Sequence, residues 1–158
     1  MNQRAVIRQV WDRRKKTLTP TPQVEKAEAF FRLVDERTDM CWEDLVDEFR
    51  RNYADAVDEI AAVLLETDDP LIIYNCIRFS DQSRPQEIAA MKRVARDCDC
   101  ERHHVGLVAL ANTKAKEVTT VLQARKDLPQ AVRAAMKPPA PRPSARKKAT
   151  DEKREDNK

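Results

Sequence analysis

A short phrase that recurs along the chain constrains its fold more than any other feature. A glutamate followed by a β-branched residue and two small or β-branched residues occurs at residues 59–62, 87–90 and 117–120, with spacings of 28 and then 30 residues. A repeat of this size is typical of stacked helical hairpins, because each hairpin buries its apolar face against the next. We therefore expect an all-α fold in which antiparallel helical hairpins stack into a short α-solenoid.

The composition agrees with a helical fold. Hydrophobic residues make up 41% of the 158 residues and charged residues 36%, and Gly106 is the only glycine. This usage favours helices over strands. No apolar stretch approaches the roughly 20 residues that span a bilayer, and the N-terminus lacks the apolar run of a signal peptide. We predict a cytoplasmic protein without a membrane span, whose four cysteines are reduced thiols.

The chain divides into three parts. Residues 1–22 form a basic helix and a proline-containing linker, residues 23–136 the helical-repeat domain, and residues 137–158 a tail rich in Pro, Lys and Arg. The first helix places Val6, Ile7, Val10 and Trp11 on one stripe. Such a stripe either folds back onto its own domain or binds a membrane surface or an acidic groove. The tail has no large apolar residue, so we expect it to be disordered.

Prolines and capping residues predict the helix boundaries. We expect about eight or nine helices, with turns near residues 67–70, 81–85, 97–101 and 127–129. Asp39 is predicted to cap one helix, and Ser83 with Gln86 to form a capping box. Residues 40–66 fit either one long helix or two, with the second beginning at Asn52. The periodicity predicts a core that includes Ile60, Leu64, Ile73, Ile77, Phe79, Ile88, Val94, Val105, Val108, Leu110, Val118 and Leu122.

The pattern resembles a known family. A phrase of the form acid-Ile-Ala-Ala opens one helix, an Asp-Pro turn follows at residues 69–70, and a shorter apolar helix completes the unit. Over residues 52–136 this resembles the HEAT-like helical repeats of the short bacterial type. The middle unit departs from the family pattern, because it carries Cys98 to His104 where a proline turn is expected. The resemblance implies a curved stack whose second helices line a concave face for protein partners, with no catalytic residues.

The side chains that could carry chemistry do not form a convincing catalytic or metal site. Cys98, Cys100, His103 and His104 are ligand types that zinc prefers, but C-x-C is tighter than the usual C-x₂-C spacing. The two histidines, as neighbours in a helix, would point about 100° apart. A phosphate-cradling loop is hard to build with one glycine. We therefore expect no catalytic residues, no metal and no cofactor.

The hypothesis that remains is a non-enzymatic adaptor or scaffold that binds protein partners. Ile72, Ile73, Cys76 and Ile77 occupy the buried stripe of one second helix, which leaves Tyr74, Asn75 and Arg78 on the opposite side. Tyr and Arg are enriched where binding energy concentrates. The predicted binding residues are Tyr74, Asn75, Arg78, His103 and His104. The sequence specifies neither the partner nor the oligomeric state.

An alternative function is association with nucleic acid through basic terminal arms. Residues 1–20 carry six basic and one acidic residue, and residues 137–158 carry eight basic and four acidic residues. Such arms can contact phosphate backbones. A stripe of bases across the repeats could add to this contact, formed by Arg78, Lys92, Arg93, Arg96, Arg102, Lys114 and Lys116. Against this alternative, aromatic residues make up only 5% of the chain, so few are present to stack on bases.

Overall fold

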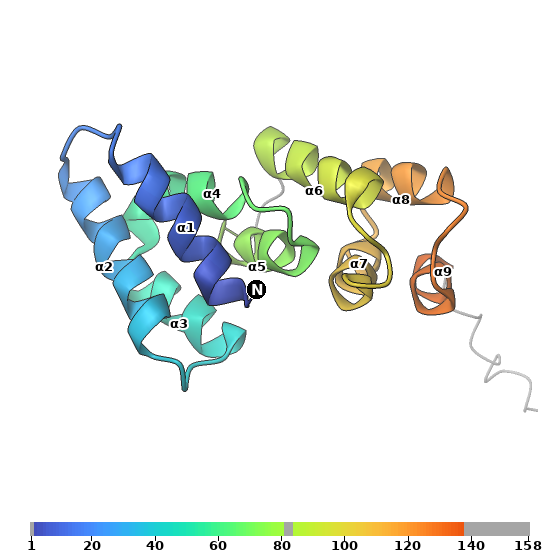
Figure 1. Ribbon diagram of the computed structural model, residues 1–158, viewed down its shortest axis with the longest axis horizontal. Coiled ribbons are helices and arrows are strands. Elements are labelled where there is room, and N and C mark those ends of the chain that lie inside the picture. The colour runs from blue at the N-terminus through green and yellow to red at the C-terminus, as the bar shows by residue number, and fades with distance from the viewer. Residues whose placement is uncertain (1, 81–83, 138–158) are drawn as a thin grey trace, which may run out of the picture.

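The computed structural model describes residues 2–80 and 84–137, and these residues form helices without any strand (Figure 1). The elements in chain order are α1 (Gln3–Lys15), α2 (Pro22–Glu36), α3 (Trp42–Asn52), the 3₁₀ turn η1 (Ala54–Ala56), α4 (Val57–Leu64), α5 (Pro70–Ser80), α6 (Pro85–Asp97), α7 (His104–Asn112), α8 (Lys116–Gln123) and α9 (Gln130–Met136). The predicted all-α class is confirmed. Apart from Lys137, the tail predicted to be disordered lies outside the described residues.

Several helices begin at prolines or capping side chains. Thr21 accepts a hydrogen bond from the backbone N–H of Val24, and Pro22 opens α2. Asp69 Oδ1 accepts from the N–H of Leu71 at the start of α5. These contacts satisfy backbone donors that have no partner within the first helical turn. The connections at residues 65–69, 98–103 and 124–129 fall near the predicted turns; the fourth includes residues 81–83, which are outside the described part.

Two predicted caps are displaced. The residue before α3 is Cys41, whose backbone N–H donates to Asp44, and Asp39 instead pairs with Arg37. That guanidinium holds the pKa of Asp39 at about 2. At α6 the capping carboxylate is that of Glu87, which accepts from the backbone N–H of Arg84, one register later than a Ser83–Gln86 box. Ser83 itself is outside the described residues.

The stretch over residues 40–66 is two helices, and Asn52 is the last residue of α3, not the first of the next helix. The chain leaves the helical conformation at Tyr53, which has φ −128° and ψ 10°. The ring of Tyr53 packs edge-on against Phe30, with centroids 5.4 Å apart. The break therefore lets α3 and α4 turn their apolar stripes toward the same aromatic core.

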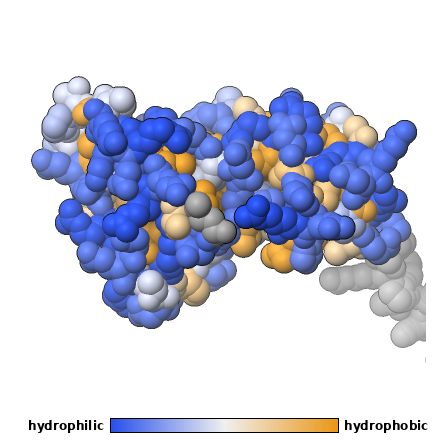
Figure 2. All heavy atoms as spheres, in the orientation of Figure 1, coloured by the Kyte–Doolittle hydropathy of each residue, from blue (hydrophilic) through white to orange (hydrophobic). Residues whose placement is uncertain are grey.

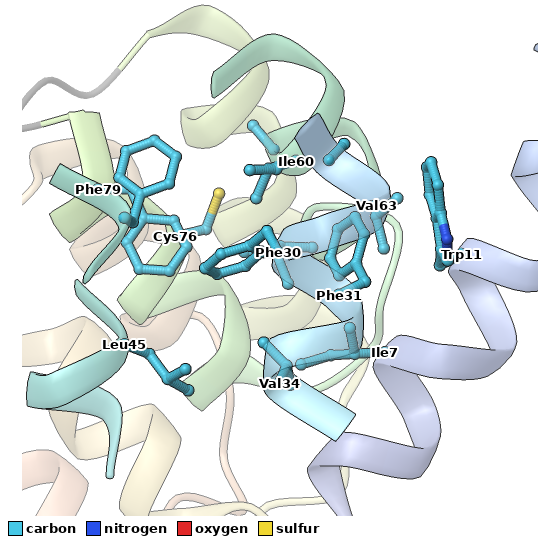
Figure 3. Close-up of a cluster of buried hydrophobic side chains, with 14 of the residues drawn as sticks. Ile7, Trp11, Phe30, Phe31, Val34, Leu45, Ile60, Val63, Cys76 and Phe79 are labelled. Atoms are coloured by element: carbon cyan, nitrogen blue, oxygen red, sulfur yellow. The ribbon is translucent and has the colours of Figure 1, made fainter. Parts of the chain in front are cut away.

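The described residues form two hydrophobic cores that share α5. The first core joins helices α1 through α5 and includes Phe30 and Phe79 (Figure 3). The ring of Phe49 belongs to the same core and stacks on that of Phe79 at 4.5 Å. The second core joins α5 to α9. Cys76 of α5 packs in the first core and Ile73 of α5 in the second. This central helix therefore stabilises both halves.

The N-terminal helix folds back onto its own domain. Ile7, Val10 and Trp11 of α1 are buried in the first core, and the helix packs against α2 and α4. Of the alternatives that the sequence leaves open for this stripe, the structure selects packing within the domain.

The helices after residue 69 form two rows. α5, α7 and α9 pack side by side in one row, and α6 and α8 pack against each other in the second (Figure 1). Most of the predicted core residues in these rows are buried, but Val105 is 58% exposed, so its prediction is wrong. α7 is apolar on all sides, and its neighbours α5, α6, α8 and α9 leave its outer side uncovered.

Gly106 lies where α7 approaches the start of α5. A Cβ at this position would lie 2.6 Å from the backbone N of Leu71 and 2.7 Å from Cγ of Pro70. Only glycine permits this separation.

Arginine side chains complete several helix ends. Arg4 donates to the carbonyl oxygens of Val34, in the last turn of α2, and of Met40, beyond its end. Arg93 donates to those of Leu65 and Thr67 after α4, at 2.8 and 2.9 Å. Arg125 donates to those of Ala95 and Cys98 at the end of α6, at 3.0 Å each. These guanidinium groups satisfy carbonyls that a glycine-based C-cap would otherwise satisfy with backbone N–H groups.

Candidate protein-binding face

The row formed by α5, α7 and α9 presents one outward surface, because the three helices run in the same direction. The start of α7 lies against the start of α5, as the contacts of Gly106 require. The ends of α7 and α9 are also adjacent, because Lys114 Nζ donates to the carbonyl oxygen of Ala135 at 2.6 Å. Residues at matching positions along the three helices therefore lie side by side.

The helical period identifies the residues on the outer side of this row. We define the α5–α7–α9 face as Leu71, Tyr74, Arg78, Val105, Val108, Asn112, Ala131 and Ala134; each is exposed or partly buried. Six of the eight are apolar or aromatic. In Figure 2, hydrophobic residues reach the surface along the lower edge of the right half, where this row lies.

The three predicted binding residues on α5 differ in their exposure to solvent. Tyr74 is partly buried and packs against the second core, and Arg78 is also partly exposed. Asn75 is only 2% exposed, so the expectation that it points to solvent is wrong. α3 covers that side of α5, where Arg78 Nη1 lies 3.0 Å from Glu43 Oε1.

Asn75 holds Arg78 in place instead. Its Nδ2 donates to the carbonyl oxygen of Leu71 at 2.9 Å, and its Oδ1 accepts from Arg78 Nη1 at 3.0 Å. The buried amide thus satisfies its donor and acceptor locally while it orients the guanidinium toward Glu43. A partner on the α5–α7–α9 face would meet Tyr74 and Arg78 but not Asn75.

The two predicted histidines lie at the beginning of α7. His104 is exposed, and its Nδ1 lies 3.2 Å from the carbonyl oxygen of Glu101. His103 lines a separate hollow of about 570 Å³ beside α1 and the α4–α5 connection, together with Arg13, Asp68 and Arg102. No residue of the α5–α7–α9 face lines that hollow. The structure therefore does not bring His103 together with Tyr74 and Arg78.

The cysteines beside these histidines are held as neutral thiols. Burial raises the pKa of Cys98 to about 11 and also raises the pKa of Cys100, whose Sγ lies 3.7 Å from Asp127 Oδ2. Neutral thiols are poor nucleophiles and poor metal ligands. Within residues 2–80 and 84–137, no three His, Cys, Asp or Glu side chains form a group suited to a metal ion.

Many of the bases considered for nucleic-acid binding contact groups within the protein. In α1, Arg8 pairs with Asp35, and Arg13 and Arg14 pair with Glu66. In the proposed stripe, Arg93 pairs with Asp68 and Arg96 with Asp97. Counterion release by phosphate binding requires cations that are free to contact phosphate, and these pairs reduce their number.

None of the helices that the structure describes is long and apolar enough to cross a membrane. No protein-family model, curated protein or solved structure matches the chain. The resemblance to HEAT-like repeats therefore stays a prediction, and the case for a function rests on the geometry of this molecule alone.

Of the eight residues of the face, the sequence predicted only Tyr74 and Arg78 as binding residues, and it wrongly assigned the exposed Val105 to the core. The neighbours of Val105 in sequence are so uniformly apolar that the helical pattern contains no polar side to mark the surface. The missing information is which side of α7 its four neighbouring helices cover, and that depends on contacts far apart in sequence.

Proposed function

We propose that this chain is a non-enzymatic protein-binding adaptor whose binding surface is the α5–α7–α9 face. In this proposal the two rows of helices act as a short HEAT-like stack, and the second helix of each hairpin contributes to the surface. The partner is a protein with an apolar patch of its own, because the centre of the face is apolar and nearly free of charge.

The exposure of Val105 carries this proposal. It is 58% exposed and is the one large hydrophobic residue in the described part of the chain that is classed as exposed. A single exposed valine is ordinary on a soluble protein. Here it continues into Val108 and Tyr74, which are partly buried on the same surface, and grouped apolar side chains are typical of an interaction site.

The nucleic-acid alternative gains no observation from the described residues. The bases of α1 that it requires are largely paired with carboxylates, as described above. Its remaining basis is the composition of the segment beyond Lys137.

The test compares two full-length variants in affinity capture with crosslinking from native lysate. Val105→Asp places a charge in the middle of the face, and Thr120→Asp places the same charge on the exposed side of α8, in the other row. We expect Val105→Asp to lose capture of the main crosslinked partner by at least about tenfold, since an unpaired charge in an apolar contact costs well over 1 kcal/mol. Thr120→Asp should capture as the wild type does.

This design avoids a change at Arg78, because the ion pair between Arg78 and Glu43 joins α5 to α3, so a substitution there would not report on the face alone. Circular dichroism and unfolding midpoints must agree between the two variants. If a folded Val105→Asp variant captures the same partner at wild-type yield, the α5–α7–α9 face is not the binding surface.

A further inference from the structure

The chain leaves its described part at the edge of the α5–α7–α9 face. Lys137, the last described residue, has its carbonyl oxygen 3.4 Å from Nζ of Lys114, which follows α7. The sequence then continues as Pro-Pro-Ala-Pro-Arg-Pro over residues 138–143, and as Ser-Ala-Arg-Lys-Lys over residues 144–148. A proline-rich segment and a basic segment therefore begin beside the end of α7.

We propose that residues 138–148 dock on the α5–α7–α9 face of the same molecule, with the proline-rich part across Val108 and Tyr74 and the basic part against α3. This inference needs no external partner, so it stands or fails independently of the adaptor function. If both hold, the segment and the partner compete for one surface.

The length of the proline-rich part matches the width of the row. A polyproline helix rises about 3.1 Å per residue, so six residues span roughly 19 Å. Packed helices lie about 8–10 Å apart, so the path from α9 across α7 to α5 is roughly 16–20 Å. The segment would therefore reach Tyr74 at its last prolines. Proline-rich segments in this conformation dock on aromatic surfaces at low entropic cost.

The charges of the segment also match those of the surface beyond α5. Beyond α5 the next helix is α3, which packs against α5 and exposes Glu43, Asp44 and Asp47 near its start. The side chain of Glu43 is 66% exposed even though it pairs with Arg78. Residues 146–148 are Arg-Lys-Lys and would lie roughly 28–34 Å along the segment. Three helix spacings from α9 to α3 amount to roughly 24–30 Å. The basic residues therefore coincide with the acidic start of α3.

The covalent link favours the intramolecular contact. A surface of this size binds a free peptide weakly, but a short connection raises the effective concentration of the segment to the millimolar range. Such a contact is also easily displaced by a partner of higher affinity.

The experiment uses the full chain with a photo-crosslinking amino acid, p-benzoylphenylalanine, in place of Ala140. Irradiation of the purified protein should produce crosslinks to residues 71–78 and 105–112, located by mass spectrometry. A matched probe at Ala124, which is exposed at the end of α8, should produce none to these residues. A mixture of ¹⁴N- and ¹⁵N-labelled protein reports whether each crosslink joins parts of one molecule or of two.

Three results would overturn the proposal: crosslinks from residue 140 only to other surfaces, crosslinks to the face that mix the two isotopes, or no crosslinks. The mixed-isotope result would identify a second copy as the occupant. A second variant tests the charge argument: changing Arg146, Lys147 and Lys148 to Glu should lower the yield of crosslinks to the face by about threefold or more, since three exposed pairs are lost. An unchanged yield would refute the contact with α3. All of these readouts come from purified protein, so they leave the adaptor function to its own test.

Discussion

Replacing Gly106 with alanine tests the close packing of α7 on α5. In an unhindered helix this substitution stabilises by about 0.8–1.0 kcal/mol, because alanine loses less backbone entropy. Here the added Cβ would lie 2.6 Å from the backbone N of Leu71 and 2.7 Å from Cγ of Pro70, so one of the two helices must move.

Overpacking of this kind costs about 1–3 kcal/mol, and backbone atoms yield less readily than the end of a flexible side chain. We therefore expect a net loss of up to about 2 kcal/mol in the free energy of unfolding. The sign of the change in the free energy of unfolding therefore distinguishes overpacking, which destabilises, from helix propensity, which stabilises.

Urea unfolding followed by far-UV circular dichroism measures this difference, provided that the slope with denaturant stays constant. Ala109→Gly, on the outer side of the same helix, is the matched control and should cost about 1 kcal/mol through helix propensity alone. If Gly106→Ala stabilises the protein by about 1 kcal/mol, α7 does not approach α5 as described.

Three further predictions concern the core, the helix ends and a buried thiol. Ile73→Ala removes a side chain that is 0% exposed and should cost about 2–5 kcal/mol, whereas Ile77→Ala, which is partly buried, should cost clearly less; equal losses in urea unfolding would contradict the assignment of their faces. Arg93→Met leaves the carbonyls after α4 without their donor and should cost about 1–3 kcal/mol, while Arg96→Met, which loses only a pairing with exposed Asp97, should cost clearly less. Burial, with a smaller contribution from a nearby carboxylate, raises the pKa of Cys76 to about 12 from a usual value near 9. Above pH 9 the unfolded chain releases this proton first, so stability should fall as the pH rises from 9 toward 12; a Cys76→Ala variant with the same pH slope would show that this thiol does not contribute.

The features that the sequence predicts correctly depend on residues that are close together in the chain. Pro22 and Pro70 mark the beginnings of α2 and α5, because proline suits the first helical turn and few other positions in a helix. The stripe of Ile7, Val10 and Trp11 predicts a helix with one buried side, although the sequence leaves open what covers it.

The wrong predictions concern residues whose exposure depends on helices that are distant in sequence. Asn75 has a polar side chain and faces away from the main apolar stripe, but α3 covers it through the pairing of Arg78 with Glu43. Val105 is apolar, but no other helix in the described part of the chain covers its side of α7, so it is exposed. A helical period reports which residues share a side, and only the packing of other helices decides whether that side meets solvent.

The guanidinium contacts make the ends of α2, α4 and α6 depend on residues from elsewhere in the chain. Arg93 lies 28 residues after Leu65, and Arg125 lies 30 residues after Ala95, close to the spacing of the recurring phrase. Arg93 of α6 therefore completes the end of α4, and Arg125, which follows α8, completes the end of α6. A chain shortened after α6 would leave the carbonyl oxygens of Ala95 and Cys98 without the guanidinium of Arg125, and we expect the end of α6 to fray even though every residue of that helix is still present.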